Sequence, residues 1–151
     1  YQGDASGRCH CTPDRITRYR AKISGPLLDR IDMHLSVAPI TRQMLMDTEH
    51  AGEGTTAVRA RVTGARAHAE ARAGGPNAAL TAADIDSHCR PEPAAATLLE
   101  RAIDQLGLSA RAYHRILRVA RTIADLDGAP EAIGSAHVAE AIGFRQLDRP
   151  G

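Results

Sequence analysis

The sequence predicts a mainly α-helical protein, in which the end of an α/β unit precedes a bundle of helices. Apolar residues recur at helical spacing over most of the chain beyond residue 80, whereas only residues 31–37 alternate between apolar and polar in the manner of a strand. Aromatic residues make up 3% of the chain and Trp is absent, so we expect an aliphatic, alanine-rich core of closely packed helices.

The first element is a predicted helix over residues 12–23. Thr12 supplies an N-cap hydroxyl, Pro13 suits the first helical position, and Asp14 lies near the positive end of the helix dipole. The Ser-Gly-Pro run at 24–26 ends this helix, and a short turn leads to the next element.

The second element is the only predicted strand, which Pro39 stops. Its apolar face carries Ile31, Met33, Leu35 and Val37. A lone strand cannot pair its own backbone N–H and C=O groups, so we expect its sheet to come from a missing N-terminal portion or from another chain. The polar opening of the sequence, which starts at Tyr1 and not at Met, leads to the same expectation.

The middle of the chain is predicted to form a short helix over 41–47 and a longer one over 56–73. The apolar face of the longer helix carries Val58, Val62, Ala65 and Ala69. The Gly-Gly-Pro-Asn run at 74–77 then breaks the chain and is the clearest boundary in the sequence.

The tail is predicted to be a bundle of four helices with short connections. Thr81 and Asp84 match a capping box, Gly107 closes a helix, and Ser109 and Ser135 are expected N-caps. The four helices are expected over 82–89, 98–106, 110–126 and from 135 onward.

The overall composition excludes some classes of function. No apolar run approaches the ~20 residues that span a bilayer, and no signal-peptide pattern is visible, so we expect a cytoplasmic protein without a membrane partner. A net charge of +1 and sparse aromatics argue against a base-stacking nucleic-acid platform. Of 19 basic residues only Lys22 is lysine, and composition bias from a GC-rich genome is the plain explanation.

Two long motifs resemble the magnesium-chelatase-like AAA+ ATPases. The first is Ser-Gly-Pro-Leu-Leu-Asp-Arg-Ile-Asp at 24–32, preceded by Arg-Tyr-Arg at 18–20 and Cys-His-Cys at 9–11. The second, at 108–126, looks like the lid helix of the family, and residues 137–142 look like its closing helix. The resemblance spans nearly the whole chain.

The resemblance implies the C-terminal part of a ring-forming ATPase. Residues 1–40 would be the end of the AAA+ core, 41–79 a connecting helical segment, and 80–151 the helical lid. It also implies identical subunits in a ring, expected to be a hexamer, with ATP and Mg²⁺ bound between neighbours.

Arg30 matches the arginine that, in related proteins, points into the nucleotide site of the neighbouring subunit. Transfer of the γ-phosphoryl group spreads negative charge over its equatorial oxygens, and a guanidinium supplied in trans stabilises that charge. The alternative is an interface salt bridge with Asp29 or Asp32.

Arg111 matches the sensor-two arginine of related lids, a direct contact to ATP. It lies in the first turn of the long helix, where free amides and the helix dipole favour an anion. The alternative is a solvated helix face on which it joins Arg115, Arg118 and Arg121 at helical spacing.

Cys9 and Cys11 are the candidate metal ligands. Two thiolates one residue apart can both bind zinc, but a structural site needs four ligands. The resemblance implies a second cysteine pair upstream, and His10 or Cys89 are further candidates. The alternative is a pair of ordinary free thiols.

The sequence has no G-x-x-x-x-G-K-[ST] loop, so we expect the chain alone neither to bind ATP tightly nor to hydrolyse it. Three functions stay open for the whole protein. The first is an ATP-driven motor on branched DNA, of branch-migration or helicase type, in natural transformation and recombination. The second is a metal-insertion ATPase of the magnesium-chelatase type. The third is a non-enzymatic DNA-binding or assembly module that uses Arg115, Arg118 and Arg121.

Overall fold

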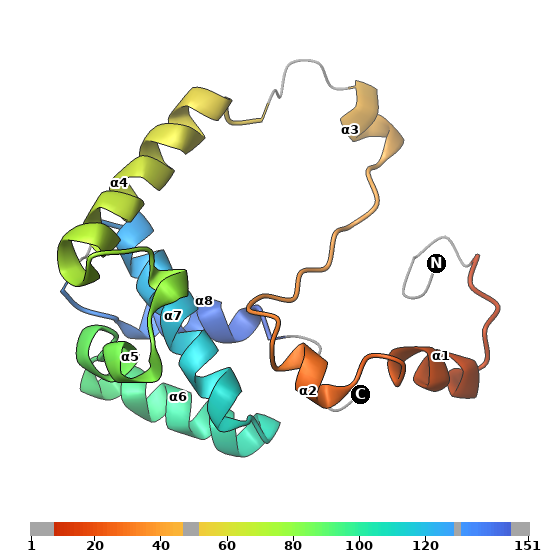
Figure 1. Ribbon diagram of the computed structural model, residues 1–151. Helices are drawn as coiled ribbons and strands as arrows, with labels where there is room; N and C mark the ends of the chain where they lie inside the picture. The colour runs from red at the N-terminus through yellow and green to blue at the C-terminus, as the bar shows by residue number, and fades with distance from the viewer. Residues whose placement is uncertain (1–7, 47–51, 129–130, 146–151) are drawn as a thin grey trace.

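The computed structural model describes residues 8–46, 52–128 and 131–145, and over these ranges the chain is mainly helical (Figure 1). None of the described helices is long and apolar enough to cross a bilayer. The elements are α1 (Pro13–Arg20), α2 (Gly25–Leu28), α3 (Arg42–Met46), α4 (Thr55–Ala73), η1 (Asn77–Ala79), α5 (Ala82–His88), α6 (Pro93–Leu106), α7 (Ala110–Leu126) and α8 (Ser135–Gly143).

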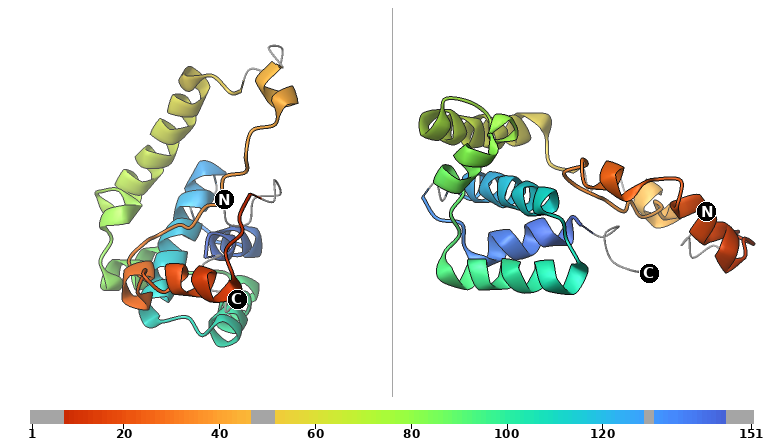
Figure 2. Two further views of the ribbon diagram at one scale, coloured as in Figure 1. Left: turned by 90° about the vertical axis from the view of Figure 1, so that its right-hand side faces the viewer. Right: turned by 60° about the horizontal axis from the view of Figure 1, so that its bottom comes forward.

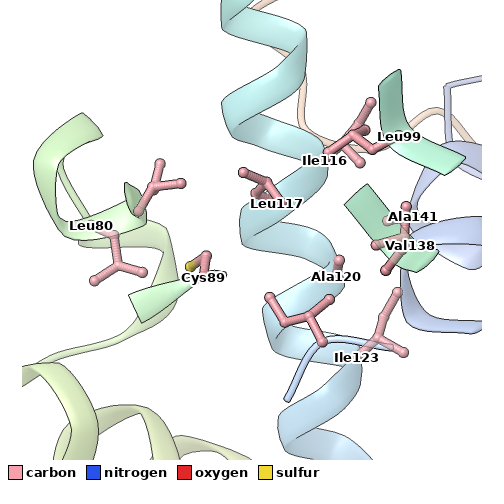
Figure 3. Close-up of a cluster of buried hydrophobic side chains, with 12 residues drawn as sticks. Leu80, Cys89, Leu99, Ile116, Leu117, Ala120, Ile123, Val138 and Ala141 are labelled. Atoms are coloured by element: carbon pink, nitrogen blue, oxygen red, sulfur yellow. The ribbon is translucent and has the colours of Figure 1, made fainter. Parts of the chain in front are cut away.

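The predicted bundle is confirmed, and α7 lies at its centre. This helix contacts α4, α5, η1 and α8, while α6 packs against α8 (Figures 1 and 2). Aliphatic side chains and alanines fill the space between the helices, as the scarcity of aromatics predicted (Figure 3). Members of this core include Ile85, Leu99, Ile116, Leu117, Ala120, Ile133 and Val138.

Local capping signals place the ends of the bundle helices. Thr81 and Asp84 form the predicted capping box at the start of α5, and the Ser109 hydroxyl accepts a hydrogen bond from the Ala112 N–H at 3.2 Å. The prediction for Ser135 is wrong by one residue. Gly134 is the N-cap of α8, and its N–H donates to Nδ1 of His137 at 3.1 Å.

The helix α6 starts at Pro93, five positions before the first apolar residue that predicted it. Pro93 occupies the first turn of α6, where its missing N–H costs nothing. Gly107 ends the helix in the left-handed region, at φ 61°, as its position in the sequence indicated.

The predicted strand over 31–37 is not a strand in the part of the chain that the structure describes. Residues 33–40 have no regular secondary structure, and every side chain from 35 to 40 is exposed. The physical reason is that a strand needs a partner for its backbone N–H and C=O groups, and no ladder forms among the described residues.

The helix α4 divides into two halves. Ala65 and Ala69 are buried against the bundle, as predicted, and the helix runs along α7. Val58 and Val62 lie on the same predicted face but are 37% and 45% exposed, because the first half of α4 extends past the bundle (Figure 1). The apolar stripe of α4 is therefore only partly covered.

The N-terminal elements are short. The predicted helix over 12–23 is α1, which ends at Arg20, and the predicted turn after it is the single helical turn α2. Neither has a buried residue, and both lie beside the bundle and not within it (Figure 2).

Candidate functional site

The segment from Asp29 to His34, which follows α2 and includes Arg30, is fastened to the bundle at its C-terminal end. Nη1 of Arg145 donates a hydrogen bond to the carbonyl oxygen of Ile31 at 2.5 Å, and Nη2 lies 4.0 Å from Oδ1 of Asp29. The N–H of His34 donates to the carbonyl oxygen of Phe144 at 2.7 Å. We call residues 29–34 the finger segment, and these contacts tie it to the end of α8.

A second anchor comes from α7. Arg115 forms an ion pair with Asp32, although the two residues lie 83 positions apart in the sequence. The side chain of Arg115 is 22% exposed and that of Asp32 is 53% exposed, so this pair lies at the surface. The finger segment is therefore held by two arginines, one on α7 and one just after the end of α8.

The side chain of Arg30 contacts the α2 turn that precedes it. Its side chain is exposed, and Nη1 donates to the carbonyl oxygen of Pro26 at 3.1 Å, which bends it back over the α2 turn. The alternative of a salt bridge with Asp29 or Asp32 is not found within the described ranges, because Arg145 lies near the first acid and Arg115 pairs with the second. The guanidinium of Arg30 has no carboxylate partner there.

Arg111 is exposed on the first turn of α7, two residues after the Ser109 cap. A hollow of about 410 Å³ lies between α2 and the turn that precedes α7. Pro26 and Asp29 line it on one side, and Gly107 and Ser109 on the other. The elements that carry Arg30 and Arg111 are therefore neighbours across this hollow.

The solvated-face interpretation of the other α7 arginines is wrong. Arg121 is 1% exposed and lies 3.1 Å from Asp125, one turn further along α7. Nη2 of Arg118 donates to the carbonyl oxygen of Leu80 at 2.6 Å, and Arg115 holds Asp32. These side chains are engaged within the protein, and Arg121 cannot reach a nucleic-acid phosphate without leaving the core.

The buried charges around Asp125 were missed by sequence reasoning. Arg72 of α4 binds both carboxylate oxygens of Asp125, at 2.7 and 2.5 Å, and the side-chain amide of Asn77 donates to it at 2.8 Å. Burial alone would raise the pKa of Asp125, but hydrogen bonds from Arg72 and Asn77 and the charge of Arg121 outweigh it and lower the pKa. This network joins α4 to α7. The only sequence signal for it was an Arg and an Asp four residues apart on an otherwise apolar face.

Cys9 and Cys11 line one hollow beside α1, together with Arg15 and Tyr19. A hydrogen bond from the backbone N–H of Cys11 lowers the pKa of the Cys9 thiol. Cys89, a further candidate ligand, is fully buried in the bundle core, and burial raises its pKa to about 11. Across the described residues, no group of three or more metal-binding side chains comes together.

The fold and the site together define a helical lid that carries an exposed arginine on a docked segment. Comparison with known proteins agrees. Residues 52–145 match the family described as "Magnesium chelatase, subunit ChlI C-terminal", and residues 1–45 match "Magnesium chelatase, subunit ChlI". The chain therefore belongs to the magnesium-chelatase-like AAA+ family, as the motifs predicted.

Curated relatives match over almost the whole chain. Competence protein ComM of Haemophilus influenzae is 43% identical over 91% of this chain, and YifB of Escherichia coli is 39% identical over 99%. A protein of Mycobacterium tuberculosis is 37% identical over 91%. The chain spans only 27%, 29% and 28% of the lengths of these relatives, respectively.

Proposed function

We propose that this chain is the arginine-donating, lid-bearing part of a ring-forming ATPase that drives a DNA motor. In this proposal Arg30 reaches the γ-phosphate of ATP held by the neighbouring subunit, and Mg²⁺ accompanies that ATP. The observation that carries the proposal is the state of Arg30: its guanidinium is exposed, while the acids on either side of it face lid arginines.

This arrangement suits an arginine that acts in trans. A guanidinium neutralised by a local carboxylate would stabilise a phosphoryl-transfer transition state less, since the two negative groups would compete for it. Here Asp29 and Asp32 are drawn toward Arg145 and Arg115. The fork of Arg30 keeps donors for an incoming phosphate group.

Arg111 is proposed as the contact of the lid with nucleotide. It lies in the first turn of α7, where the helix dipole adds to the attraction for phosphate. Its exposed side chain leaves it accessible to a ligand that another part of the protein, or another subunit, supplies.

DNA is proposed as the substrate of the motor because one relative is named a competence protein and the family motifs of this chain resemble those proteins. The family description itself, magnesium chelatase, favours a second candidate: an ATPase that drives metal insertion. The module that binds DNA through Arg115, Arg118 and Arg121 is not favoured, because all three side chains are engaged within the protein.

The role of Arg30 is tested in the full-length protein. Replacing Arg30 with Ala is expected to lower ATP turnover by about 10³-fold or more while ATP binding persists, since the arginine acts on the transition state. Mixing Arg30→Ala subunits with subunits that lack a working phosphate-binding loop should restore part of the turnover, because some interfaces then combine an intact loop with an intact arginine. Unchanged turnover in the single variant, or no recovery on mixing, would refute the proposal.

The two candidate substrates are separated by what stimulates turnover. A DNA motor is expected to hydrolyse ATP faster with branched DNA, with a response that weakens as salt rises. A metal-insertion ATPase is expected to ignore DNA and to support insertion of Mg²⁺ into a porphyrin. Arg101→Ala is a matched control for both assays, because Arg101 is an exposed arginine of α6 outside the proposed site.

A further inference from the structure

The finger segment and the end of α8 are joined by contacts that the proposed chemistry does not itself require. Arg145 follows Phe144, which is the first residue after α8. Although Arg145 is charged, it is fully buried. Burying a guanidinium is costly unless its donors are used. Nη1 of Arg145 donates to the carbonyl oxygen of Ile31, and Nη2 lies 4.0 Å from Oδ1 of Asp29, within ion-pair distance but too far for a hydrogen bond. Ile31 and Asp29 are the two residues that flank Arg30.

We infer that Arg145 is a positioning residue for Arg30, with Arg115 as its second anchor, so that the trans-acting arginine moves as one body with the lid of its own subunit. This inference rests on the proposed function of Arg30. It also couples neighbouring nucleotide sites. A movement of the lid in one subunit would also move the Arg30 that this subunit presents to its neighbour.

The contacts lie on both sides of Arg30 and therefore fix its position. Arg145 grips the backbone at Ile31, one residue after Arg30, and lies near the side chain of Asp29, one residue before it. The backbone bond from His34 to Phe144 and the ion pair from Arg115 to Asp32 prevent the segment from pivoting about that grip. Figure 1 shows the chain after α2 passing beside the end of α8. The two segments are distant in the sequence, since Ile31 and Arg145 lie 114 positions apart. Since α2 has a single helical turn and no buried residue, little else in the described chain holds Arg30 in place.

The first arm of the test measures the anchor without ATP. In the 151-residue chain, hydrogen exchange of the His34 amide is expected to be slow and to become at least about 10-fold faster in Arg145→Met, because the bond to Phe144 loses its neighbouring support. Amides of α7 report whether the bundle remains folded, and Arg101→Met is the matched control. Unchanged exchange at His34 in a folded Arg145→Met variant would overturn the inference.

Where Arg145→Met fails to fold, Asp32→Asn provides the independent variant. It removes the charge that Arg115 holds at the surface and leaves the buried Arg145 in place. Faster exchange over residues 31–34 with an unchanged melting temperature supports the anchor. Unchanged exchange there argues against it.

The second arm measures the consequence in the full-length ATPase. A displaced arginine is expected to lower kcat by about 10- to 100-fold with KM for ATP nearly unchanged, because the contact is made in the transition state. Arg145→Lys, which keeps the charge near Asp29 but loses the fork, is expected to fall between wild type and Arg145→Met. A merely structural role would lower the amount of active enzyme and the melting temperature together.

The outcomes separate the two proposals. If Arg30→Ala abolishes turnover while folded Arg145 variants retain full kcat, the positioning role is wrong and the proposed function stands. If Arg30→Ala leaves turnover intact, the proposed function is wrong, and the exchange experiment alone decides whether Arg145 anchors the finger segment.

Discussion

Arg72 on α4 and Asp125 on α7 form a two-pronged ion pair across 53 positions of sequence, with Nη1 and Nη2 at 2.7 and 2.5 Å from the two carboxylate oxygens. The carboxylate also faces Arg121, and the Asp125 side chain is inaccessible to solvent. Two guanidinium groups therefore share this carboxylate. Loss of the Asp125 carboxylate is therefore expected to destabilise the bundle.

Replacing Asp125 with Ala is expected to cost about 3–5 kcal/mol of unfolding free energy, since it removes the buried carboxylate that Arg72 and Arg121 share. Urea denaturation followed by circular dichroism measures the loss. Asp104→Ala, at an exposed site on α6, is the matched control and is expected to change stability by less than about 0.5 kcal/mol. A loss below about 1 kcal/mol at Asp125 would show that the network contributes little.

Stability is expected to fall in acid partly through Asp125. The pKa of this carboxyl is lower in the folded chain than its ordinary value of 3.8, so the stabilisation is fully present above that value. It is lost as the pH falls through the lower, folded-state pKa. Below about pH 4 the unfolding free energy should decline more steeply in the wild type than in Asp125→Asn. Parallel declines would contradict the assignment.

The cap of α7 offers a test of local stability. The Ser109 hydroxyl accepts the bond from the Ala112 N–H, so Ser109→Ala is expected to cost about 1 kcal/mol. Ser135→Ala is the matched control: Ser135 was predicted to be a cap, but it lies inside α8 and Gly134 holds the cap position. It is expected to be close to neutral. Equal losses at both serines would mean that the α7 cap has no special role.

The three cysteines are expected to react at different rates. Cys89 is fully buried with a pKa raised to about 11, so at pH 8 it has little thiolate and no access to reagent. Cys11 is exposed and Cys9 is partly exposed. Iodoacetamide should label these two in the native chain and Cys89 only in denaturant, as read by mass spectrometry of peptides. Native labelling of Cys89 would contradict the structure of the core.

Most of the fold could be predicted from local sequence signals. The capping box of Thr81 and Asp84, the break at Gly107 and the long apolar face of α7 each depend on residues a few positions apart, so the sequence alone could place them. The strand over 31–37 also looked local, but a ladder needs a second segment, and periodicity says nothing about whether that segment is present.

The sequence predicted only part of the candidate site. Arg30 and Arg111 followed from motif resemblance, and their roles remain proposals. The role of Arg145 could not be predicted from the sequence, because its partners Asp29 and Ile31 are more than 100 positions away along the chain. Helical spacing placed Arg121 on a solvated face with the other α7 arginines. The sequence did not show that Asp125 compensates its buried charge, because that carboxylate is also bound by Arg72 from another helix.

The hydrogen bond from Arg145 to the carbonyl oxygen of Ile31 joins two residues that lie 114 positions apart in the sequence. During synthesis residue 31 leaves the ribosome well before residue 145 has been made. The contacts that join the finger segment to the end of α8 can therefore form only after residues 144 and 145 have been made.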